Sequence, residues 1–128
     1  MAREVNSETK SKWRRVFAGL SLATHEQKIS WARTALETAF VTSLGNHVIL
    51  FEKQEDDEEI NYVVKLLDDV GELVDEFDDR DIEEDLFENA YFSKMANMYL
   101  KIRRQVSGAD SAIDDVLVEL DKLDGIPF

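Results

Sequence analysis

A heptad-like spacing of apolar residues in the middle of the chain restricts the fold more than any other feature. Between residues 60 and 77 the apolar residues recur at intervals of 3-4-3-4-3, as Ile60, Val63, Leu67, Val70, Val74 and Phe77. In an α-helix this spacing places all six on one side, which packs against another helix. We therefore expect a helix that begins near Asp56 or Asp57 and ends before a polar turn at 78–81.

Apolar stripes with helical spacing recur elsewhere in the chain. They predict four further helices, over about 7–20, 24–44, 82–106 and 110–123. Thr24 and Gln27 match a capping box at the start of the second helix, and Gly45-Asn46 is a suitable end for it. The segment 47–51 fits either a short strand or a further helical turn.

Turn-forming residues are scarce, which argues against a sheet. The 128 residues include one proline and five glycines, fewer than a strand-rich domain normally has. We therefore expect a single helical domain over 1–128, all-α, built as a bundle of four to five amphipathic helices. The expected core contains Trp13, Phe17, Leu36, Phe40, Ile60, Val63, Leu67, Val70, Val74, Phe77, Met95, Tyr99, Ile102, Leu117 and Leu120.

Acidic residues are concentrated in one block. The net charge is −13, and residues 54–93 hold 17 acidic and 2 basic residues. A field of this sign repels nucleic acid and attracts basic protein surfaces, so we expect no direct nucleic-acid binding. Two basic sets remain, Lys10, Lys12, Arg14 and Arg15 around Trp13, and Lys94, Lys101, Arg103 and Arg104. They either complement the acidic helices or bind phosphates or single strands.

Most signatures of catalysis and targeting are missing from the sequence. The chain has no cysteine, no Gly-rich phosphate loop and no HExxH motif, and it lacks the run of about 20 apolar residues that spans a membrane. We expect His25 to be solvated and His47 to be structural. We also expect a cytoplasmic protein with no membrane partner and no cofactor.

One acidic pattern has a precedent among enzymes. Residues 64–73 (VKLLDDVGEL) and 82–88 (IEEDLFE) resemble the paired acidic helix motifs of the MazG-like all-α nucleoside triphosphate pyrophosphatases. The resemblance covers about 45 residues. It implies a Mg²⁺ site at Asp69, Glu72, Asp85 and Glu88, and a nucleotide pyrophosphohydrolase activity.

The acidic block itself predicts a protein–protein interaction. We expect an acidic helical-bundle protein that docks a basic protein surface, as an inhibitor, immunity protein, nucleic-acid (DNA) mimic or adaptor does. The expected contact residues are Asp68, Asp75, Glu76, Asp78, Asp79, Glu83, Glu84 and Trp31. The alternatives are the Mg²⁺-dependent enzyme and a structural subunit that forms a homo-oligomer through apolar helix faces.

Overall fold

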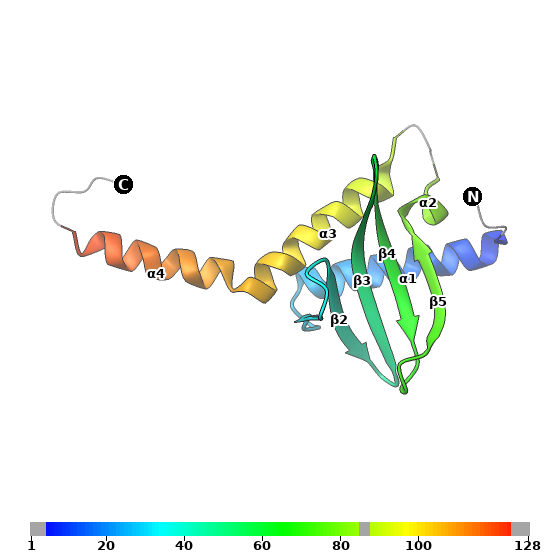
Figure 1. Ribbon diagram of the computed structural model, residues 1–128, viewed down its shortest axis with the longest axis horizontal. Coiled ribbons are helices and arrows are strands. Elements are labelled where there is room, and N and C mark those ends of the chain that lie inside the picture. The colour runs from blue at the N-terminus through cyan, green and yellow to red at the C-terminus, as the bar shows by residue number, and fades with distance from the viewer. Residues whose placement is uncertain (1–4, 85–87, 124–128) are drawn as a thin grey trace.

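The computed structural model describes residues 5–84 and 88–123, and it shows a mixed α/β fold (Figure 1). The elements, in chain order, are α1 (Ser7–His25), β1 (Ala32–Arg33), β2 (Ala39–Leu44), β3 (His47–Asp56), β4 (Glu59–Leu67), β5 (Leu73–Asp78), α2 (Asp79–Ile82), α3 (Ala90–Ser107) and α4 (Ala109–Asp121). The expected all-α bundle is therefore wrong, because the middle third of the chain forms strands.

The strands form one antiparallel sheet in which each strand pairs with the next along the chain. The order is β1-β2-β3-β4-β5, and the longest ladder pairs β3 with β4 from Val48↔Leu67 to Asp56↔Glu59. Helices α1 and α3 lie side by side across one face of the sheet (Figure 1). In the described part of the chain, no helix covers the opposite face.

The core lies between the sheet and these two helices. Side chains from α1, α3 and alternate strand positions pack together, and aromatic rings fill the centre. Phe51, Tyr62 and Tyr99 have ring centroids 5.6–6.2 Å apart, the range in which aromatic pairs attract one another. This packing holds α1 and α3 in fixed positions relative to each other.

The apparent heptad over 60–77 belongs to two strands rather than one helix. Its spacing arose by chance, because β4 carries apolar residues on both faces and so lacks a clear alternation. Val63 and Phe77 are buried as expected. The other four residues of the heptad pattern are not buried, since Leu67 is half-buried and Ile60, Val70 and Val74 are exposed.

The helix predicted over 24–44 is also wrong. Thr24 lies in the last turn of α1, where its Oγ1 accepts a hydrogen bond from Trp31 Nε1 at 2.9 Å. Residues 39–44 form β2, and Gly45-Asn46 is the hairpin turn to β3, with Gly45 at a φ of 60°. Residues 47–51 take the strand conformation, one of their two expected alternatives.

The predicted first, fourth and fifth helices exist as α1, α3 and α4, but α3 begins at Ala90 instead of near Ile82, and the turn expected at 78–81 contains the short helix α2. Trp13, Phe17, Met95, Tyr99 and Ile102 are buried, as expected. Helix α4 extends away from the body instead of joining a bundle (Figure 1), so Leu117 is exposed and Leu120 is half-exposed. Within the described residues, no helix has the length and apolar character needed to cross a membrane.

Candidate functional site: two charged surfaces and an exposed helix

The β3–β4 hairpin ends in five successive acidic residues, which we call the acidic tip: Glu55, Asp56, Asp57, Glu58 and Glu59. All five are exposed. Asp56 and Glu59 are paired directly across the two strands, an arrangement in which like charges repel. Asp57 turns the chain with a φ of 37°, in the left-handed region that aspartate tolerates better than most residues. The acidic tip is thus a turn made of charged residues.

Helix α2 lies at the same end of the sheet as the acidic tip (Figure 1). Arg80 Nη1 is 3.5 Å from Glu59 of the tip, and Arg80 Nη2 is 2.8 Å from Asp78. Asp78 and Asp81 form a capping box that satisfies backbone N–H groups at the start of α2. These two carboxylates are therefore partly committed to holding the local backbone.

Asp79 is the one aspartate of this region that is buried. Its Oδ1 accepts a hydrogen bond from the Tyr62 backbone N–H at 2.9 Å. Burial raises the pKa of the Asp79 carboxyl above its ordinary value of 3.8, although the hydrogen bond from Tyr62 lowers it. The side chain joins α2 to β4 and is closed to a partner protein.

The expected contact residues do not share one face. Trp31 and Asp79 are buried, and Asp75 accepts a hydrogen bond from Trp13 Nε1 at 2.9 Å. The others lie in several elements and have local partners in most cases. Asp68 accepts hydrogen bonds from backbone N–H groups of the β4–β5 turn, and Asp78 caps α2. Glu76 is paired with Lys65 across β4 and β5. Glu83 accepts a hydrogen bond from the Tyr91 N–H, and the Glu84 carboxylate lies 3.4 Å from Arg14 Nε.

The expected Mg²⁺ ligands are spread over the fold. Asp69 and Glu72 lie in the β4–β5 turn, whereas Glu88 lies in the chain between α2 and α3, and α2 is at the opposite end of the sheet (Figure 1). Asp85 lies outside the described residues. Nine strand residues separate the two ends, roughly 25–30 Å. Among residues 5–84 and 88–123, no three His, Asp or Glu side chains are grouped to hold a metal. The Mg²⁺ site stays a prediction from the sequence.

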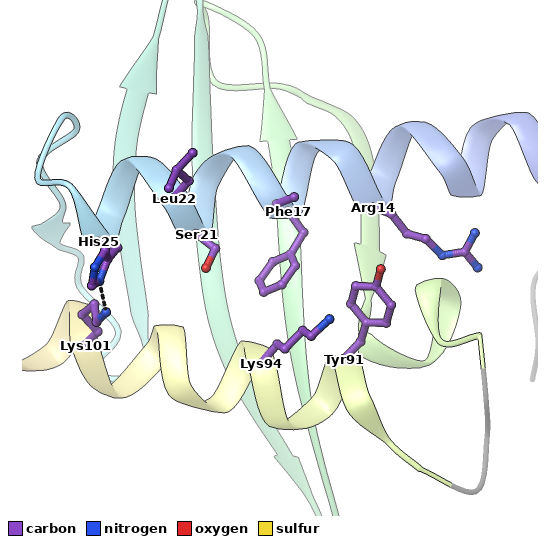
Figure 2. Close-up of a pocket in the computed structure, with 9 residues that line it drawn as sticks. Arg14, Phe17, Ser21, Leu22, His25, Tyr91, Lys94 and Lys101 are labelled. Atoms are coloured by element: carbon purple, nitrogen blue, oxygen red, sulfur yellow. Dashed lines mark hydrogen bonds between the residues drawn. The ribbon is translucent and has the colours of Figure 1, made fainter.

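A groove of about 430 Å³ runs between α1 and α3, on the side that faces away from the sheet (Figure 2). We call it the basic groove. Its basic lining residues are Arg14 and His25 from α1 and Lys94 and Lys101 from α3, and its apolar and small lining residues are Phe17, Ala18, Ser21, Leu22 and Tyr91. No carboxylate belongs to this described lining. The groove is therefore a cationic surface in a protein of net charge −13.

The cations of the basic groove are held in place by local contacts. Lys101 Nζ lies 2.6 Å from His25 Nδ1, and because an ammonium only donates, the imidazole nitrogen accepts (Figure 2). Lys94 Nζ lies over the Tyr91 ring, 4.9 Å from its centroid. Arg14 Nε donates to the Ile82 carbonyl oxygen at 2.8 Å. The groove is thus a formed surface of the folded protein.

Helix α4 presents an apolar side with no described neighbour. We call Ile113, Val116, Leu117 and Leu120 the α4 stripe, since they follow one another at i, i+3, i+4 and i+7. Val116 is 56% exposed and Leu117 is 45% exposed. No residue of α4 is buried. The stripe predicted from the sequence therefore exists, but no described residue of the chain covers it.

Several residues of these surfaces were not selected from the sequence. The acidic tip was assigned to the start of a helix, and the lining residues Ser21, Leu22 and Tyr91 were not considered. The two basic sets did contain Arg14, Lys94 and Lys101. These two basic sets were a sequence signal for the basic groove, because they lie on the two helices that form it.

We compared the chain with protein-family models, curated proteins and solved structures, and none of these matches it.

Proposed function

We propose that this protein is an interaction protein that docks a basic protein surface through the acidic tip. The observation that carries the proposal is the run of five exposed carboxylates at the end of the β3–β4 hairpin. Such a row of charges steers a basic partner toward the tip and raises the association rate. The sequence also predicts docking through acidic residues, but on two helices. The proposed docking surface is instead the turn of a β-hairpin.

The acidic tip destabilises its own hairpin, which suggests that the charges are kept for a function. The cross-strand pair Asp56↔Glu59 sets like charges against each other, which destabilises the hairpin. A two-residue hairpin turn usually contains Asn-Gly or Asp-Gly, whereas this turn is Asp57-Glu58. Solubility does not need charges so close together, because acids spread over the surface would serve as well.

The central carboxylates of the tip are available to a partner. Glu55 and Glu59 lie near Lys53 and Arg80, respectively. Asp56, Asp57 and Glu58 form no ion pair with any described residue, so docking them requires no internal pair to break. The β3–β4 ladder continues into the core at Phe51 and Val64, which gives the hairpin a rigid base.

The test compares two baits with the same net charge. The tip variant carries Asp56→Asn, Asp57→Asn and Glu58→Gln. The control carries Glu37→Gln, Asp69→Asn and Asp115→Asn, which neutralise three exposed acids in other parts of the fold. We expect a protein with a basic surface to be captured from the native host by the wild type and by the control, and to be lost with the tip variant.

Comparing the two variants shows whether capture depends on where the neutralised acidic residues lie. Both variants change the net charge by the same amount, so a loss with both would reflect overall charge rather than docking at the tip. Circular dichroism of each variant checks that the fold is kept. Equal capture of a basic protein by the wild type and the tip variant would overturn the proposal.

A further inference from the structure

We propose that α4 of one copy docks in the basic groove of a second copy, and that the two copies exchange this contact reciprocally. The proposal concerns a different surface from the acidic tip and does not depend on it. It rests on an apolar side of α4 that residues 5–84 and 88–123 leave uncovered, on a groove of complementary charge, and on the short connection between α3 and α4.

The described residues of the same chain do not cover the α4 stripe. Ile113, Val116 and Leu117 are each close to half exposed or more, and together they line a shallow apolar depression on the helix surface. A helix of 13 residues is only marginally stable in water unless its apolar side packs against something. A contiguous exposed stripe of this kind marks an interaction surface.

The connection to α3 prevents α4 from folding back on its own chain. Helix α3 ends at Ser107 and α4 begins at Ala109, so Gly108 alone joins them. Two antiparallel helices in contact need a connection of about two to five residues. Gly108 adopts a φ of 67°, which ends α3 and sends α4 outward (Figure 1). A second copy can therefore be reached where the same chain cannot.

The basic groove matches α4 in size and in apolar character. The groove extends along α1 from Arg14 to His25, about 16 Å of helix, and α4 is about 20 Å long. The ring of Phe17 gives the groove an apolar floor, and Leu22, which is 58% exposed, adds apolar area on its α1 side (Figure 2). An amphipathic helix that lies in such a groove is a common mode of recognition.

The charges that border the α4 stripe are opposite to those of the groove. At about 100° per residue, Asp114 and Asp121 lie along one border of the stripe and Glu119 lies along the other, whereas Lys122 lies on the far side. The groove presents Lys94 and Lys101 with no carboxylate in its described lining. Acidic borders would therefore meet basic walls while the apolar stripe meets the floor.

Electrostatic repulsion disfavours the docking of α4 on two other surfaces of a second copy. Two α4 helices packed against each other would bring their acidic borders together. The open face of the sheet carries Glu76 beside the Lys65–Glu52 pair, so the acidic borders of α4 would meet further carboxylates there. The basic groove offers both apolar area and cations, and its described lining contains no carboxylate.

Two valines give a matched pair of variants. Val116 lies in the α4 stripe, and Val118 lies outside it on the same helix with nearly the same exposure, 56% against 55%. We expect the full-length wild type to sediment as a dimer of the 14.7 kDa chain. Val116→Asp should raise the dissociation constant of the dimer more than tenfold, and Val118→Asp should leave it nearly unchanged. Equal circular dichroism spectra confirm that both variants fold.

Crosslinking identifies the surface that α4 contacts. The chain has no cysteine, so introduced thiols are the only ones present. A short bismaleimide should link Val116→Cys of one copy to Ser21→Cys of another, since Ser21 lines the groove. A wild type that is monomeric at every concentration, or a crosslink that joins two Val116→Cys chains more readily than the mixed pair, would overturn the proposal. Loss of the dimer with capture of a basic protein intact would leave the acidic-tip function standing.

Discussion

At the residue scale, Asp79 shows how burial changes the role of an acid within the acidic block. Asp79 is the first residue of α2, its carboxylate accepts a hydrogen bond from the Tyr62 N–H, and its burial raises its pKa. The folded state therefore binds a proton more tightly than the unfolded state does. The contribution of Asp79 to stability is fully present below its ordinary pKa of 3.8 and is lost as the pH rises through the raised folded value.

Substitutions at Asp79 separate its hydrogen bond from its charge. Asp79→Asn keeps an oxygen for the Tyr62 N–H and removes a buried charge, so it should be at least as stable as the wild type at pH 7. Asp79→Ala leaves a buried N–H without its acceptor and should lose about 1–3 kcal/mol. Urea unfolding at pH 4 and pH 7 measures both effects. The wild type should gain stability relative to Asp79→Asn at the lower pH, and the opposite trend would contradict this assignment.

The same scale explains why the expected contact residues are scattered. Aspartates at turns and helix starts bind nearby backbone N–H groups, as Asp68 and Asp78 do here. Composition alone counts such residues as free negative charge, since it does not reveal which of them cap the backbone. Trp31 was expected among the contact residues, but its indole packs in the core and donates to Thr24.

At the element scale, the acidic block contained the turn signals of the sheet. Asp57 reverses the chain at a position where glycine is commonly found, and a single glycine, Gly71, serves the turn at 68–72, so the scarcity of glycine and proline was misleading. The helices α1, α3 and α4 were predictable, because each has a clear 3.6-residue stripe. Strand β4 was not, because Tyr62, Val63 and Val64 are buried in succession and leave no alternation.

The acidic tip also makes a prediction at this scale. Asp57→Asn keeps a residue that tolerates a positive φ and removes one of the adjacent negative charges. We expect it to raise the free energy of unfolding by about 0.5 kcal/mol, the order of a single cross-strand charge effect. Thermal unfolding at low salt measures the gain, with Glu37→Gln as a control for an exposed acid elsewhere. A stability decrease in Asp57→Asn would show that the carboxylate has a structural role.

The sequence pattern predicts helix α4 and its apolar side, but not what covers that side. Its apolar stripe predicts that one side is covered, with Leu117 and Leu120 in a core within the chain. An amphipathic pattern specifies which side is apolar but not what covers it. The position of Gly108 directly between two helices was visible in the sequence, and its consequence for the direction of α4 required the structure.

At the scale of the whole molecule, the acidic and the basic surfaces lie in different parts of the fold. The acidic tip lies at one end of the sheet, the basic groove lies across the helical layer, and α4 extends from the far end of α3 (Figures 1 and 2). This arrangement leaves the tip open when α4 is docked in the groove of a second copy. A dimer would then present two acidic tips, which strengthens binding to a partner with repeated basic sites.

The measurement that tests the central claim most directly is the association rate of the captured basic partner at two ionic strengths. For the wild type, and for the control variant of Glu37, Asp69 and Asp115, the rate should fall steeply as salt rises, because exposed charges are screened within about 10 Å at 0.1 M. The variant of Asp56, Asp57 and Glu58 should associate more slowly at low salt and show a flatter salt dependence. An association rate and salt slope equal to those of the wild type would contradict docking at the acidic tip.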